Sequence, residues 1–100
     1  MKKKNFVVLM KMTEKGLNVG KDTPKWIRKA IEDFKKMEGA TLNGFYKVMG
    51  DNDFLALIEV DDDETALAFV MLLSSTGYVR TTTLKAFTLD QLDEAIDKIS

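Results

Sequence analysis

Four apolar, β-branched stretches along the chain predict strands. They lie at 5–13, 41–49, 53–60 and 79–87. The turn formers Gly50, Asp51 and Asn52 separate the second stretch from the third. So short a connection predicts that these two strands form an antiparallel hairpin.

Apolar residues at helical spacing predict three helices between and after these strands. The first two cover about 24–37 and 63–75, and the third is a short terminal helix. Thr23 and Pro24 mark the start of the first helix, as an N-cap followed by proline at the first helical position. Thr88 and Gln91 have the spacing of a capping box at the start of the terminal helix. Residues 14–22 are rich in turn formers and predict a loop.

The order of these elements predicts the fold class. Strand–helix–strand occurs twice, and a helix follows. The crossovers are expected to be right-handed, and the two units interleave naturally with the first and third strands at the centre of the sheet. The sequence therefore predicts an α+β fold, the ferredoxin-like βαββαβ antiparallel sheet with an extra C-terminal helix. No linker interrupts the pattern, so residues 1–100 are expected to form one domain.

The central strands are apolar on both faces, which predicts a second copy of the chain. In the first strand Phe6, Val8 and Met10 point to one side, whereas Val7 and Leu9 point to the other. Both helices of such a fold lie on one face, so the other face would meet water uncovered. Because burial of a Val or Leu side chain is worth about 1.5–3 kcal/mol, we expect two sheets to stack as a homodimer. The terminal helix could instead fold back over this face, although one short helix is too small to cover four strands.

The helix predicted at 63–75 is apolar almost all round, so another element must cover its outer side. The terminal helix offers an apolar stripe that suits either this helix or a neighbouring subunit. The stripe consists of Leu89, Leu92, Ala95, Ile96 and Ile99.

Composition removes several kinds of chemistry. The sequence has no cysteine and no histidine, which excludes disulfides and thiolate nucleophiles and removes the commonest general base and metal ligand. We therefore expect no metal and no cofactor. The 15 basic and 16 acidic residues leave a net charge of −1, which weighs against a nucleic-acid partner. No apolar segment reaches the length of a membrane span and no secretory leader is visible, so a cytoplasmic location without membrane contact is expected.

Two charge runs have alternative interpretations. The basic run Lys2-Lys3-Lys4 suits a solvated N-terminal tip better than a phosphate-binding arm. The acidic run at 61–64 could bind a cation, but it opens a predicted helix. Because negative charge stabilises a helix N-terminus, we favour capping.

Three segments resemble the GYD domain proteins. They read VLMKMTEKG at 8–16, FYKVMGDNDFLALIEV at 45–60 and GYVRTTTLKAFT at 77–88. The Gly-x-Tyr-Asp motif of that family falls on Gly50 to Asp53, with Asn52 in place of the usual tyrosine. Thr82 stands where the last strand often carries glutamate. The resemblance implies a dimeric α+β barrel but no particular reaction, because relatives of that fold range from cofactor-free monooxygenases to effector-binding domains.

Five side chains are candidates for ligand binding, and no catalytic residue is assigned. Asp53 could act as a general base or simply satisfy turn donors. Arg80 could anchor a carboxylate or pair with Asp53. Lys11 interrupts an apolar strand and could enter a pocket or reach water. Trp26 and Tyr46 are large amphipathic aromatics, and Trp26 suits either the core or the wall of a cavity.

Three functional hypotheses remain open. The favoured one is a homodimeric or higher domain that binds a small, partly apolar molecule, because the strands are apolar and His and Cys are absent. The second is a cofactor-independent monooxygenase or isomerase that uses Asp53 with Arg80. The third is a structural or partner-binding oligomerisation module.

Overall fold

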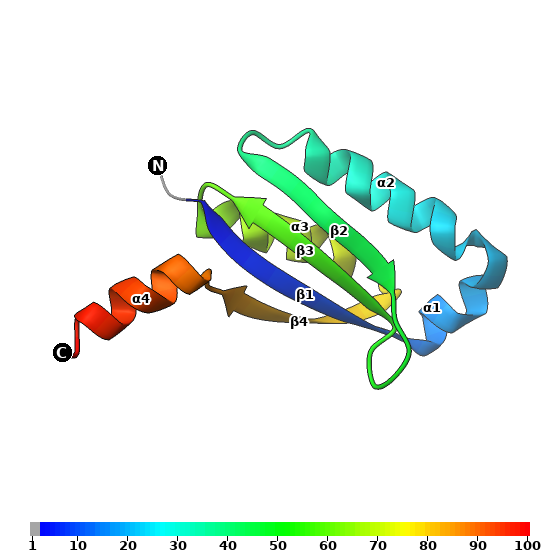
Figure 1. Ribbon diagram of the computed structural model, residues 1–100. Coiled ribbons are helices and arrows are strands. Elements are labelled where there is room, and N and C mark those ends of the chain that lie inside the picture. Colours follow the sequence, from blue (N-terminus) through cyan, green and yellow to red (C-terminus); the bar gives the residue numbers. More distant parts are fainter. Residues whose placement is uncertain (1–2) are drawn as a thin grey trace.

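The first and third strands form the centre of a four-stranded antiparallel sheet, as the sequence predicted. In a computed structural model, which describes residues 3–100, the strand order is β2-β3-β1-β4 (Figure 1). Lys2, part of the basic run, lies outside the described residues. The strands are β1 Lys4–Met12, β2 Ala40–Lys47, β3 Phe54–Val60 and β4 Val79–Ala86. The predicted antiparallel hairpin of β2 and β3 is confirmed, with a register irregularity between Leu42 and Gly44.

The helical elements include one that the sequence did not predict. They are α1 Glu14–Val19, the 3₁₀ turn η1 Gly20–Asp22, α2 Thr23–Lys35, α3 Asp63–Ser74 and α4 Leu89–Asp97. The predicted loop at 14–22 is wrong, because α1 and η1 occupy it. Thr13 caps α1 by accepting a hydrogen bond of 3.1 Å from the Gly16 amide. Gly16 is buried so closely against the Tyr78 carbonyl that a side chain would overlap it, which explains a glycine inside a helix.

Thr23 is not the N-cap of α2, contrary to the prediction. The N-cap is Asp22, which makes no capping hydrogen bond with its side chain. Because η1 leads directly into the helix, the Thr23 hydroxyl donates backwards to the Gly20 carbonyl oxygen at 2.7 Å. Pro24 still lies in the first turn, where its missing N–H costs nothing.

The core lies between one face of the sheet and the two long helices, α2 and α3. On β1 and β3 every second side chain is buried on this face, which follows from the period of two along a strand. At the centre of the core the rings of Phe34 on α2 and Phe69 on α3 lie 4.4 Å apart, centroid to centroid, and both are fully buried.

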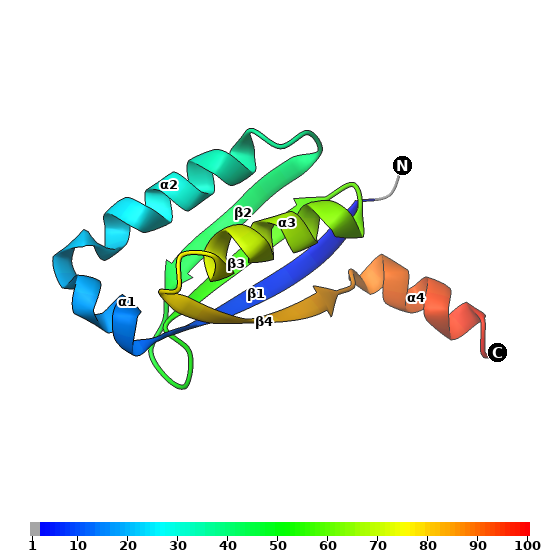
Figure 2. The same cartoon turned by 180° about the vertical axis from the view of Figure 1, so that it is seen from behind.

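The opposite face of the sheet, here called the open face, carries no helix. Figure 1 views this face with α3 behind the strands, and Figure 2 shows α3 in front of them from the other side. Val7, Leu9, Leu55 and Leu57 of the central strands point to the open face and are half-buried by their neighbours. The predicted two-sided apolar character of the sheet is therefore confirmed.

Helix α4 projects away from the end of β4 instead of packing on the sheet (Figure 1). The predicted capping box at Thr88 and Gln91 is confirmed. The helix has no buried residue, so within one chain it neither folds back over the open face nor covers α3. The outer side of α3 consequently stays uncovered, with Leu67 57% and Met71 61% exposed. None of the helices in residues 3–100 is long and apolar enough to cross a membrane.

Candidate functional site

The open face is organised in rows that run across the strands. Leu9 lies between Leu55 of β3 and Thr82 of β4 in the hydrogen-bonded register. The next row places Val7 between Leu57 and Leu84 in the same way. These two rows form a continuous apolar block at the centre of the sheet.

Three of the five candidate residues lie on the open face. Lys11 and Arg80 are cross-strand partners in the β1–β4 ladder, and both are exposed. Tyr46 extends the row of Leu9 and Leu55 on β2 and is 54% exposed. Within the part of the chain that the structure describes, neither Lys11 nor Arg80 forms an ion pair, and both cations lie at the same end of the open face.

Asp53 lies at the edge of this face and is held by the backbone. Its carboxylate accepts a hydrogen bond of 2.7 Å from the Met12 amide. The second carboxylate oxygen lies 3.6 Å from the Lys47 ammonium nitrogen. The alternative pairing of Asp53 with Arg80 is therefore not formed, because Lys47 is the cation that lies near this carboxylate.

Trp26 lies on the other side of the sheet, away from the other candidates. Its ring packs against that of Tyr78 with centroids 5.2 Å apart, and it borders the core cluster. Its indole N–H is buried without a hydrogen-bond partner among the described residues. The core interpretation of Trp26 agrees with this packing.

A groove opens between the start of α2 and the end of the sheet where β2 finishes and β3 begins. It encloses about 640 Å³ and is mostly apolar, with Met12, Ile27, Ile31 and Phe45 among its walls. Its two charged lining residues are both cations, Arg28 from α2 and Lys47 from β2. None of the five predicted candidates lines this groove. No sequence pattern indicated this groove, because Arg28 lies beside the core residue Ile27 as charged residues do throughout an amphipathic helix.

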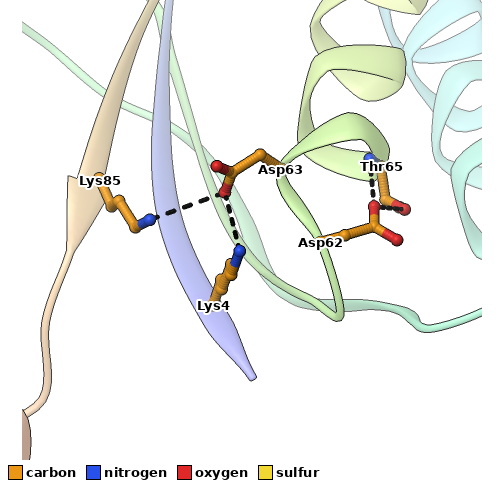
Figure 3. A network of polar contacts seen from close by, with 5 residues as sticks. All are labelled: Lys4, Asp62, Asp63, Thr65 and Lys85. Carbon is orange, nitrogen blue, oxygen red and sulfur yellow. Dashed lines mark hydrogen bonds and ion pairs between the residues drawn. The ribbon is translucent and has the colours of Figure 1, made fainter. Parts of the chain in front are cut away.

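The acidic run at the start of α3 caps the helix (Figure 3). The Asp62 carboxylate accepts hydrogen bonds from the Thr65 amide at 2.8 Å and from its hydroxyl at 2.7 Å. These bonds hold the pKa of Asp62 below its ordinary value. Asp63 lies 3.6 Å from the ammonium groups of both Lys4 and Lys85. Asp62 and Asp63 thus each have a structural partner, and residues 3–100 contain no cluster of three or more potential metal ligands.

Comparison with solved structures identifies the fold class of the chain. The chain is similar to the crystal structure of MtbAldR, with a TM-score of 0.60 and 16% identity over 85% of this chain and 52% of that one. It is also similar to the crystal structure of FFRP-DM1, with a TM-score of 0.55 and 20% identity over 84% of this chain and 99% of that one. The solution structure of the C-terminal domain of MgtC from Mycobacterium tuberculosis gives a TM-score of 0.55 and 16% identity, covering 84% and 87% of the two chains. At these identities the likeness shows the ferredoxin-like α+β fold alone.

The family follows from the sequence match. Residues 6–96 match the model of the GYD domain, and the chain belongs to this family. A relative from Thermus thermophilus is 29% identical over 87 residues, which is 87% of this chain and 92% of the relative. That protein is named glutamine synthetase and cystathionine beta-lyase binding protein.

Proposed function

We propose that this protein is a self-associating module that binds other proteins, and that two copies stack through their open faces into a dimeric α+β barrel. The observation that carries this proposal is the apolar block of Val7, Leu9, Leu55 and Leu57, which no element of residues 3–100 covers. Full burial of an exposed Val or Leu side chain is worth about 1.5–3 kcal/mol. These four are already half-buried, so stacking gains about half of that for each, in all about 3–6 kcal/mol, which reaches the lower end of the cost of association, about 4–15 kcal/mol.

The charges on the open face favour one arrangement of the two sheets. Lys11 and Arg80 lie at one end, whereas Glu59 lies two rows beyond Leu55 toward the other end, where it accepts a hydrogen bond of 2.7 Å from Asn43. A twofold axis that lies in the plane between the two sheets and runs perpendicular to the strands places the cationic end of one copy against the Glu59 end of its partner. An axis parallel to the strands would instead bring like charges together, which is unfavourable.

Binding of a further protein is supported by the apolar surface that stacking leaves exposed. Leu67 and Met71 on α3 and the stripe along α4 lie outside the open face. Exposed apolar patches of this kind mark interaction sites. The name of the Thermus thermophilus relative points to metabolic enzymes as the class of partner. The enzyme hypothesis gains no such support, because the Asp53 carboxylate is held by the Met12 amide and neither Asp53 nor Arg80 lines the groove.

Self-association is tested by light scattering on the full chain. We expect a mass of at least two chains for the unchanged protein and a shift to one chain for Leu57→Glu, which places a charge in the apolar block. Leu67→Glu is the matched control, because Leu67 is also an exposed leucine but lies on α3. A one-chain mass for the unchanged protein at micromolar concentration contradicts the proposal.

Partner binding is tested with purified glutamine synthetase and cystathionine beta-lyase from the organism that encodes this chain. Calorimetric titration of the full chain into each enzyme is expected to show saturable binding to at least one of the two. An unrelated oligomeric enzyme serves as the negative control. If neither enzyme binds, or the control binds equally well, the chain does not share the partner class of its relative.

A second candidate function is binding of a small, partly apolar molecule in the groove. The volume of about 640 Å³ lies within the range of ligand pockets, about 300–1,000 Å³. Arg28 and Lys47 among apolar walls favour a molecule with a carboxylate on a hydrocarbon body. A thermal-shift series of monocarboxylates of increasing chain length tests this function, with Ile31→Trp as the groove-filling control. An equal shift in both proteins would show that any binding occurs elsewhere.

A further inference from the structure

The first turn of α4 borders the open face at the end where β1 begins. Two hollows lie there, of about 250 Å³ and about 380 Å³. Asn5 of β1 and Thr88, the N-cap of α4, line both of them, so the two hollows adjoin. Figure 1 shows α4 at this end, beyond the arrowhead of β4. We call the two hollows together the end hollow.

The smaller part of the end hollow continues the apolar block. Val7 and Leu57 of that block line it, together with Phe87, the first residue after β4. The Phe87 side chain is 68% exposed. The apolar surface of the open face therefore extends as far as the base of α4.

The larger part of the end hollow is acidic. Glu59 of β3 and both Asp90 and Glu94 of α4 line it. The cation Lys3 lies there too, but its ammonium group forms an ion pair of 2.6 Å with Asp61. This part of the hollow therefore keeps an excess of negative charge.

The opposite end of the open face has the complementary charge. Lys11 and Arg80 are exposed there as cross-strand partners, and neither forms an ion pair within residues 3–100. Asn5 and Lys11 both lie on β1, and their separation along the strand is roughly 20 Å at about 3.3 Å per residue. The two cations consequently do not reach the end hollow of their own chain.

Stacking through the open faces brings these two ends together. The twofold axis that the charges favour runs across the strands, so each strand lies over the same strand of the other copy and points the opposite way. Arg80 near the start of β4 then faces the end of the second β4, where α4 begins. Lys11 near the end of β1 faces Asn5 at the start of the second β1.

We propose that the end hollow of one copy receives the Lys11 and Arg80 end of a second copy, with Arg80 facing Asp90 and Lys11 facing Glu59. The inference rests on the proposed self-association and adds that α4 takes part in it. The contact forms twice in the dimer, and charge complementarity and the continuous apolar surface both favour it.

The apolar stripe of α4 stays exposed in this arrangement. Asp90 and Glu94 line the end hollow. At 3.6 residues per turn, Leu92 and Ile96 fall on the opposite side of the helix. Contact with the second copy therefore uses the polar side of α4 and leaves the apolar side for a further protein.

Carbodiimide coupling of the full chain tests the placement, because it joins a lysine amine to a carboxylate only where the two are in contact. Ordinary and isotope-labelled protein are mixed in equal amounts, allowed to exchange subunits and coupled, and the linked peptides are identified by mass spectrometry. We expect Lys11 to be joined to Glu59 or Asp90, with labels from both copies in one linked peptide.

Coupling of Lys11 only to carboxylates at its own end, such as Asp53, overturns the inference. The absence of any Lys11 linkage in a protein whose mass is at least two chains overturns it as well. A one-chain mass overturns the proposed self-association itself, so the two failures are distinguishable.

Charge reversal provides a second readout, the dissociation constant of the dimer measured by analytical ultracentrifugation. Arg80→Glu and Asp90→Arg should each raise it by about four- to twenty-five-fold, because one exposed ion pair is worth about two- to fivefold and the axis forms it twice. Arg28→Glu and Glu32→Arg on α2 are the matched controls, since both residues are exposed on the other side of the sheet, and they should leave it unchanged.

An equal mixture of Arg80→Glu and Asp90→Arg should associate as tightly as the unchanged protein. In the mixed dimer the two substituted positions attract each other in one contact, and the unchanged Arg80 and Asp90 pair in the other. Weakening without recovery in the mixture overturns the pairing of Arg80 with Asp90, and so does a dissociation constant that neither variant changes.

Discussion

The Asp53 carboxylate accepts a hydrogen bond of 2.7 Å from the amide nitrogen of Met12, a residue 41 positions away in the chain. The Asp53 amide donates in turn to the Met10 carbonyl oxygen at 2.8 Å. The regular β1–β3 register ends at the pair of Met10 and Phe54. One side chain thus continues the connection between the two central strands beyond their ladder, at the end where the groove opens.

Removal of the Asp53 carboxylate should destabilise the fold. Asp53→Ala leaves the Met12 amide without its acceptor, and we expect the free energy of unfolding to fall by about 1–3 kcal/mol. Urea denaturation monitored by circular dichroism measures the loss. Asp51→Ala is the control, because Asp51 lies in the same turn and is exposed. Equal midpoints for the two variants would contradict a structural role for Asp53.

Gly16 should be intolerant of a side chain although it lies in a helix. Alanine normally stabilises a helix interior relative to glycine by about 0.5–1 kcal/mol. At this position the added methyl group would overlap the Tyr78 carbonyl, so Gly16→Ala should instead cost about 1–3 kcal/mol. Chemical denaturation of Gly16→Ala shows whether the substitution stabilises or destabilises the fold. Asn18→Ala, at an exposed position of α1, is the control. A stabilised Gly16→Ala variant would show that α1 is not packed on Tyr78 as described.

Phe34 joins the two long helices at the centre of the core. Its ring is fully buried and lies 4.4 Å from that of Phe69, centroid to centroid. Phe34→Ala should therefore lower the free energy of unfolding by about 3–5 kcal/mol, through lost burial and a residual cavity. Phe87→Ala is a matched control, because Phe87 is 68% exposed. A smaller loss for Phe34 than for Phe87 would mean that the core is elsewhere.

Stability should depend on pH through Asp62. The hydrogen bonds from Thr65 hold the pKa of this carboxyl below its ordinary value of 3.8 in the folded chain. Its contribution is therefore fully present above the unfolded pKa and is lost as the pH falls through the lower folded value. Asp62→Ala should be less stable than the unchanged protein at pH 7, and this difference should shrink at pH values well below 3.8.

Urea midpoints at neutral and low pH measure this difference. Asp62→Asn is the control, because asparagine also caps a helix but does not titrate in this range. Its stability relative to Asp62→Ala should change little with pH. If the gap between the unchanged protein and Asp62→Ala is the same at both pH values, the Asp62 charge has no part in capping α3.

Local sequence patterns were sufficient to predict most of the helices and strands. The period of two in β1 and β3 and the capping residues Thr88 and Gln91 depend on near neighbours in the chain, and the structure agrees with them. The segment 14–22 was misjudged because its helix depends on a distant partner. Thr13 and Gly16 both contact the 77–78 segment, which lies more than 60 positions later. Such a contact leaves no periodic signal in the sequence.

The same distinction between local patterns and contacts of distant residues applies to the candidate site. The sequence by itself determined the order of the four strands and of α2, α3 and α4, the excess of apolar side chains on both faces of the sheet, and the family, because each is encoded by residue type and spacing. Only the tertiary structure decided that Lys11 and Arg80 are neighbours, that Asp53 pairs with Lys47 instead of Arg80, and that Arg28 and Lys47 share a groove. Those relationships depend on strand register and on where helices cross the sheet, and these are set by packing between residues far apart in the chain.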